Sequence, residues 1–107
     1  MTKVTIYRDE FYLHAEGHSK AGKRGKDVIC AAISTLTQTF AHVAESMDAS
    51  GLCAQKTEIE TADGELRVRV YPRTRYKTAC QLKLDTVAEG LLMLQEEYPK
   101  NLVVEIR

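Results

Sequence analysis

Several features of secreted, membrane-bound and repetitive proteins are missing from this sequence. The three cysteines, at positions 30, 53 and 80, form no close pair, which argues against a disulfide framework and favours reduced thiols. No stretch approaches the roughly 18 consecutive apolar residues of a membrane helix. The polar, alternating N-terminus lacks the apolar run of a signal peptide. We therefore expect a cytoplasmic protein that makes no membrane contact.

An excess of charge of either sign is also absent. Fifteen Lys and Arg residues balance fifteen Asp and Glu residues among the 107, so the formal net charge is +0. A neutral chain has no bulk attraction for nucleic acid, and we expect no direct nucleic-acid binding. There are no internal repeats or Pro-rich linkers, and Pro72 and Pro99 each close a segment. A chain of this size is expected to form one domain spanning residues 1–107.

Alternation of apolar and polar residues predicts five strands. Two are expected over residues 3–8 and 11–16, with a short turn between them. Two more, over 56–61 and 66–71, flank the Asp63-Gly64 pair, which is typical of a hairpin turn. A last short strand is expected over 102–106.

Helical periodicity predicts two amphipathic helices. The first runs from about Asp27 to Met47, because apolar residues recur there every three or four positions (Ile29, Ile33, Leu36, Phe40, Val43 and Met47). The second begins near Ala79, and its apolar stripe consists of Leu84, Val87, Ala88, Leu91, Leu94 and Tyr98. The order is ββαββαβ, an α+β fold with two helices packed on one mostly antiparallel sheet.

Cys30 is a candidate nucleophile because of its position. It lies in the first turn of the predicted helix, where free backbone amides and the helix dipole favour a thiolate. The other interpretation is a small buried apolar residue, since free cysteines are commonly buried. Cys53 and Cys80 lack a Cys-x-x-Cys partner or a nearby histidine, so we expect no metal and no cofactor.

His18 is the candidate general base. It follows Gly17 at the end of the second predicted strand and enters the loop that leads to Cys30. An imidazole beside a thiol at a helix N-terminus is a nucleophile with its base. On chemistry alone the pair is a weak signal, and a solvated loop histidine is the alternative.

The residues around this pair resemble the signature of the ribosomal-processing cysteine proteases, often called Prp. The Gly17-His18 pair is followed, at positions 25–34, by the segment GKDVICAAIS. His18 and Cys30 keep the twelve-residue separation of the family's catalytic His and Cys. The resemblance extends to the element order and to Glu-Tyr-Pro at 97–99. Residues 19–24 are more basic than the family pattern, which bears on substrate preference.

The resemblance implies a bacterial cysteine endopeptidase. Members remove a short N-terminal extension from large-subunit ribosomal protein twenty-seven, act as homodimers, and cover the substrate with the loop between the catalytic residues. The cleaved segment is hydrophobic, with aromatic residues just before a small residue at the scissile bond. On this basis Cys30 is the nucleophile and His18 the general base and acid.

Four further residues are expected to support the site. Asp27 either orients His18 or caps the helix, and both roles are compatible. Ser34 either hydrogen-bonds near the thiol or bonds back to its own helix backbone. Gly17 and Gly25 provide conformational freedom to the loop.

Two other functions remain open at this point. The first is a non-catalytic module that binds ribosomal protein or RNA through its sheet and basic loop. The arginines and tyrosines interleaved over residues 67–76 are compatible with it, although an outward strand face has the same pattern. The second is a thiol redox sensor at Cys30.

Overall fold

The computed structural model describes residues 1–17 and 28–107. The strands are β1 (Thr2–Tyr7), β2 (Tyr12–Gly17), β3 (Glu58–Ala62), β4 (Glu65–Arg69) and β5 (Leu102–Ile106). The helices are α1 (Val28–Ala49) and α2 (Lys77–Glu97), and two short 3-10 turns, η1 (Arg8–Glu10) and η2 (Thr74–Tyr76), precede β2 and α2. The predicted order ββαββαβ and the α+β fold are confirmed.

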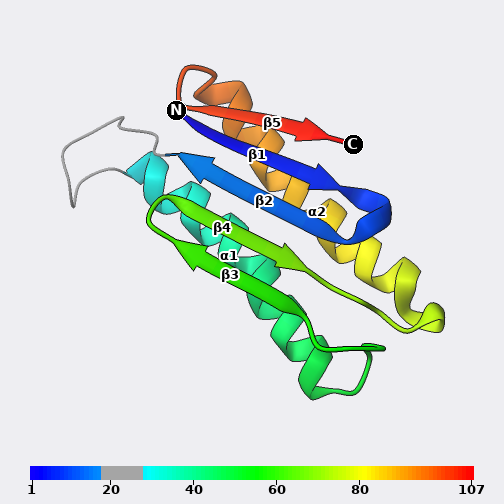
Figure 1. The fold of residues 1–107 in the computed structure, drawn as a ribbon. Helices are drawn as coiled ribbons and strands as arrows, with labels where there is room; N and C mark the ends of the chain where they lie inside the picture. The colour runs from blue at the N-terminus through cyan, green and yellow to red at the C-terminus, as the bar shows by residue number, and fades with distance from the viewer. Residues whose placement is uncertain (18–27) are drawn as a thin grey trace.

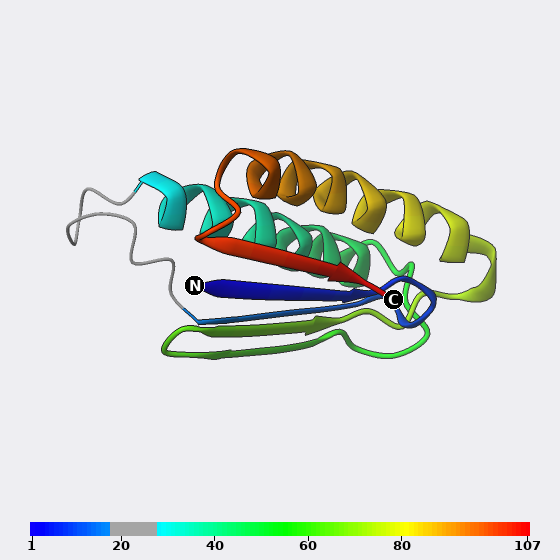
Figure 2. The same cartoon turned by 90° about the horizontal axis from the view of Figure 1, so that it is seen from above.

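The five strands form one sheet in the order β3-β4-β2-β1-β5 (Figure 1). Neighbouring strands are antiparallel except β5, which pairs parallel to β1. β4 also runs parallel to β5, because two antiparallel pairings separate β4 from β1, and α2 is the crossover connection between these two strands. Both helices lie on the same face of the sheet (Figure 2), and no described helix covers the other face, called here the uncovered sheet face.

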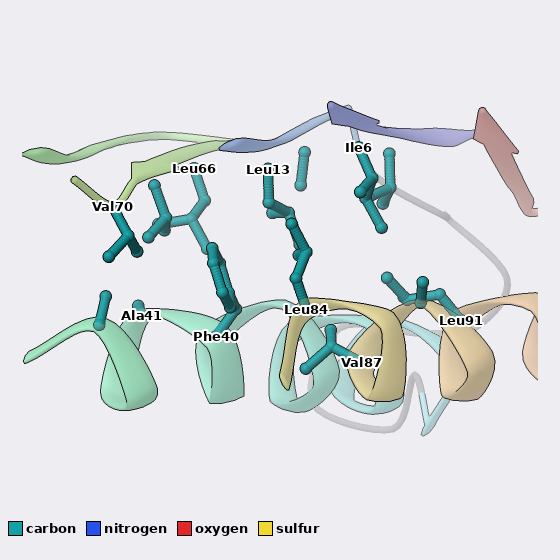
Figure 3. Packing of buried hydrophobic residues seen from close by; sticks show 14 of the residues in the cluster. Ile6, Leu13, Phe40, Ala41, Leu66, Val70, Leu84, Val87 and Leu91 are labelled. Atoms are coloured by element: carbon teal, nitrogen blue, oxygen red, sulfur yellow. The ribbon is translucent and has the colours of Figure 1, made fainter. Parts of the chain in front are cut away.

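The core lies between the helices and the sheet. Side chains from both layers point toward one another in Figure 3, with Phe40 and Leu84 facing Leu13 and Leu66. On β1 and β2 the alternate residues Val4, Ile6, Leu13 and Ala15 are buried, as the strand pattern predicts.

The buried face of α1 differs from the predicted stripe. Ile33, Phe40 and Met47 are buried, but Leu36 and Val43 are only half-buried. The buried positions between them are held by small residues, namely Thr37, Ala41 and Ala44. A search for large apolar residues at helical spacing does not identify these small residues as buried, although their size allows the helix to approach the sheet closely.

The observed element boundaries differ from the predicted ones by at most two residues. The predicted second strand included Phe11, but this residue ends η1 in the left-handed region at φ 52° and β2 begins at Tyr12. Helix α1 extends to Ala49 rather than Met47, and α2 begins at Lys77 rather than near Ala79.

Candidate active site

Cys30 is the third residue of α1 and is half-buried. The first backbone amides of a helix have no partner within the helix, and the helix dipole is positive there. No acidic residue is present in the described first turn of α1. The start of a helix thus offers Cys30 backbone N–H groups that are free to bind an oxyanion.

The thiol opens onto a cleft of about 220 Å³ at one end of the molecule. Three segments meet there: the first turns of α1, the C-terminal end of β2 with the start of β1, and the β3–β4 hairpin (Figures 1 and 2). The lining residues on α1 are Cys30, Ile33, Ser34, Thr37 and Gln38. Those on the sheet are Thr2, Ala15, Glu16, Gly17, Ala62, Gly64, Glu65 and Leu66.

Gly17, the last residue of β2, joins this strand to the hairpin across the cleft. Its φ is +94°, and its backbone amide donates a 2.8 Å hydrogen bond to the carbonyl oxygen of Gly64 in the β3–β4 turn. The end of β2 is therefore held to the hairpin that forms the far wall. Glycine adopts such a positive φ without the steric cost that a side chain would bring.

Three of the predicted site residues, His18, Gly25 and Asp27, lie outside the described residues. The other three, Cys30, Ser34 and Gly17, line the same cleft. Residues from the end of β2 and from the start of α1 thus line one cleft, and the roles predicted for them stay predictions.

Ser34 lies one helical turn beyond Cys30. Its Oγ accepts a 2.8 Å hydrogen bond from the Nε2 amide of Gln38. A back-bond from Ser34 to its own helix is not found among the residues the structure describes. Thr37 makes that contact instead, donating to the carbonyl oxygen of Ile33 at 3.0 Å.

The β3–β4 hairpin is the part of the site that the sequence did not reveal. Its turn was predicted from Asp63-Gly64, but turn chemistry does not say where a hairpin lies in a sheet. Strand order places β4 beside β2, and this brings Gly64, Glu65 and Leu66 opposite Cys30.

Two glutamates of the sheet, Glu16 and Glu65, line the cleft, and Glu65 makes short contacts with its neighbours. Glu65 Oε1 lies 2.9 Å from His14 Nε2 and 2.7 Å from Arg67 Nε. These two hydrogen bonds, from His14 first and Arg67 second, hold the pKa of Glu65 below its ordinary value. Glu65 is therefore ionised at neutral pH.

The two other cysteines have environments that oppose thiolate formation. Cys80 has no solvent-exposed surface, and burial, with a smaller contribution from Cys53, raises the pKa of its thiol to about 11. Burial also raises the pKa of the Cys53 thiol, and the Asp48 carboxylate adds to this effect. Neither thiol is placed for nucleophilic chemistry.

The cations on the uncovered sheet face are paired with carboxylates. Arg67 contacts Glu65 and Arg69 contacts Glu10, at 2.7 and 3.1 Å. Arg107 contacts Glu105 at 2.9 Å. This pairing reduces the positive charge that an RNA-binding face requires.

In the parts of the chain that the structure describes, no three His, Cys, Asp or Glu side chains gather closely enough to hold a metal ion. Neither α1 nor α2 contains an apolar stretch that could cross a bilayer.

Solved structures share this fold. An essential ribosomal processing protease Prp from S. aureus, in complex with a covalently linked product peptide, is 23% identical, with a TM-score of 0.76 and full coverage of both chains. The Streptococcus mutans protein SMU.848 is 22% identical, with a TM-score of 0.69 over 99% of this chain and 93% of that one. A comparison with curated proteins found no match.

A protein-family model gives the stronger evidence. The model described as cysteine protease Prp matches residues 1–103, which is nearly the whole chain. The chain therefore belongs to the cysteine protease Prp family.

Proposed function

We propose that this protein is a cysteine endopeptidase that removes the N-terminal extension of large-subunit ribosomal protein twenty-seven. The observation that carries the proposal is the position of Cys30, in the first turn of α1 and open to a cleft. Membership of the Prp family supports the protease activity. The S. aureus relative, a ribosomal processing protease bound to a peptide, supports the class of substrate.

In the proposed mechanism, the Cys30 sulfur attacks the carbonyl carbon of the scissile bond while His18 takes the thiol proton. The C–N bond then breaks, and His18 returns this proton to the departing amine. A water molecule, deprotonated by His18, hydrolyses the resulting thioester and regenerates the thiol. His18 follows Gly17 directly in the sequence, and Gly17 lines the cleft of Cys30.

The first-turn amides of α1 are the proposed donors to the oxyanion. They have no partner within the helix, and they lie on the same turn as Cys30. Asp27 is proposed to cap the helix, to orient His18, or to do both. Gly25 is proposed to give conformational freedom to the segment between His18 and Cys30.

The substrate segment is proposed to be extended and hydrophobic next to the cleavage site. The floor of the cleft contains the apolar side chains of Ala15, Ile33 and Leu66, which suit such a segment. Val28, two positions before Cys30, is apolar and 75% exposed, and adds to the apolar surface near the thiol.

We also propose that residues 1–107 act as one catalytic domain in a cytoplasmic homodimer without direct nucleic-acid contact. Two large apolar side chains on α2, Leu82 and Met93, are 59% and 68% exposed. Eleven residues, about three turns, separate them, so they lie on one side of the helix. They are the candidate dimer contacts, and light scattering of a Leu82→Glu/Met93→Glu variant tests this.

The test of the activity is mass spectrometry of the ribosomal protein precursor from the same organism. The precursor is incubated separately with wild type, with Cys30→Ala and with His18→Ala. One cut near the N-terminus of the precursor, made by wild type alone, is the expected result. An intact precursor in every reaction, with the wild-type protein folded, would overturn the proposal and favour a non-catalytic binding module.

A further inference from the structure

One face of α1 carries a row of polar side chains that leads away from the thiol. Cys30, Ser34 and Gln38 are spaced four residues apart, and all three line the cleft. Side chains at this spacing are neighbours on a helix surface, with about 5–6 Å between their Cβ atoms. Helical side chains also lean toward the N-terminus, so each of these side chains leans toward the one before it.

The hydrogen bond between Gln38 and Ser34 has a direction that matters. The Nε2 amide of Gln38 donates to Ser34 Oγ at 2.8 Å and occupies an acceptor site of the hydroxyl. A hydroxyl has one proton and two lone pairs, so the proton of Ser34 remains available for another acceptor. No acceptor for this proton is found among the residues the structure describes.

Thr37 shows the usual alternative for a hydroxyl in a helix, which is to donate its proton to a backbone carbonyl of the preceding turn. Thr37, also on α1, donates to the carbonyl oxygens of Ile33 and Ser34 at 3.0 and 3.2 Å, so its proton is committed to the backbone. Ser34 lines the same cleft as Thr37, but its hydroxyl accepts from a side chain, and no bond from it to a backbone carbonyl is found among the described residues. The difference between the two hydroxyls is therefore the presence of Gln38.

We propose that Gln38 is a positioning residue that directs the hydroxyl proton of Ser34 to the sulfur of Cys30. The hydrogen bond from Ser34 then stabilises the thiolate, because hydrogen bonds to ionised acceptors are stronger than those between neutral groups. Gln38 does not touch the reacting atoms and acts through Ser34. The proposal rests on the proposed function, in which Cys30 is the nucleophile.

The test is the rate of Cys30 alkylation by iodoacetamide as a function of pH, followed by peptide mass spectrometry. In Gln38→Ala the rate near neutral pH falls about three- to tenfold, and the midpoint of the rate profile moves to higher pH. In Gln38→Glu the carboxylate accepts the Ser34 proton and withdraws it from the sulfur, so the rate falls at least as far. Gln81→Ala, which removes a half-buried glutamine of α2 that donates to Asp9 instead, leaves the rate unchanged.

A double-mutant cycle separates the relay from a general disturbance of the helix. In a Ser34→Ala background, Gln38→Ala has no further effect on the alkylation profile, because the hydroxyl that it orients is gone. An equal effect of Gln38→Ala with and without Ser34 would overturn the proposal. So would identical profiles for wild type and Gln38→Ala, with circular dichroism showing that both are folded.

Alkylation reports on the sulfur whether or not a ribosomal precursor is cleaved. An unchanged profile in Gln38→Ala, together with cleavage by wild type, would overturn the relay and leave the proposed function standing. The expected profiles with an uncut precursor would support the relay and remove the proposed function.

Discussion

A Cβ atom on Gly17 would lie 2.3 Å from the carbonyl oxygen of Met1, which rests directly against the end of β2. Gly17 also has a φ of +94°, a conformation that is strained for residues with a side chain. We predict that Gly17→Ala lowers the free energy of unfolding by about 1–3 kcal/mol. Precursor cleavage should also slow, because Gly17 lines the cleft of Cys30. Urea denaturation and mass spectrometry measure the two effects.

Gly51 provides a matched control. Its φ is +74°, but no atom lies within 4 Å of the position that a Cβ would take. Gly51→Ala therefore carries the backbone strain without the collision, and it should cost less stability than Gly17→Ala. Equal losses for the two variants would show that the contact with Met1 has no energetic consequence.

The three thiols should differ in reactivity by position. Near neutral pH we predict that iodoacetamide modifies Cys30 first, Cys53 more slowly, and Cys80 only when the protein unfolds. Burial accounts for Cys80, whose thiol pKa of about 11 leaves almost no thiolate. Labelling in the absence and presence of denaturant, read by peptide mass spectrometry, gives the order. Equal and slow labelling of all three would remove both the protease and the redox-sensor interpretations of Cys30.

Cys53 offers a separate test of the electrostatics. The neighbouring Asp48 carboxylate contributes to the raised pKa of its thiol. We predict that Asp48→Asn accelerates alkylation of Cys53 by less than about tenfold, since burial is the larger cause. The rate at Cys30, in the same sample, is the internal reference and should not change.

The ion pair between η1 and α2 should make stability depend on pH. Arg8 donates to both carboxylate oxygens of Asp85, at 2.7 and 2.8 Å, and these bonds hold the pKa of Asp85 below its ordinary value. A carboxyl with a lowered pKa stabilises the fold above its unfolded pKa, and this contribution is lost as pH falls through the folded value. We predict that the loss of stability between about pH 5 and about pH 2 is smaller in Asp85→Asn than in wild type. Urea midpoints across this range measure it, and parallel curves would contradict the prediction.

The two helices pack closely at Gly90. A Cβ at this position would lie 2.8 Å from Cδ2 of Leu36 on α1. We predict that Gly90→Val lowers the free energy of unfolding by about 1–3 kcal/mol, because a branched side chain would force the helices apart. Gly90→Ala should cost less, since the tip of Leu36 can rotate and alanine favours the helix.

The collision can be tested directly with the partner side chain. In a Leu36→Ala background, Gly90→Val should cost clearly less than it does alone, because the atom that it meets is absent. Additive losses from urea denaturation would mean that the two residues are not coupled.

Local patterns in the sequence were sufficient to predict the strands and α-helices that the structure describes, although not the two 3-10 turns. Alternation on β1 and β2 and the spacing of Ile33, Phe40 and Met47 on α1 reflect which side of each element meets the core. Boundaries were less predictable, because Phe11 ends a 3-10 turn in the left-handed region instead of continuing its strand. Thr37 and Ala44 are buried through the close approach of helix and sheet, which no local pattern encodes.

The candidate site was predicted in part. The motif around Cys30 identified the family and placed the thiol in the first turn of a helix, since these depend on contiguous residues. Gly64, Glu65 and Leu66 were not predicted as site residues, because their place beside Gly17 follows from strand order. The orientation of Ser34 was left open, because a hydroxyl can bond to its own helix or to a neighbouring side chain.

By itself, then, the sequence determined the elements, their order and the residues of the chemical motif, because hydrophobic periodicity and motif spacing act over a few neighbouring residues. Only the tertiary structure decided which elements enclose the cleft. Pairing β4 with β2 brings together residues nearly fifty positions apart, Gly17 and Gly64, through a single backbone hydrogen bond. Such pairing depends on how all five strands share one core, and that is a property of the whole chain.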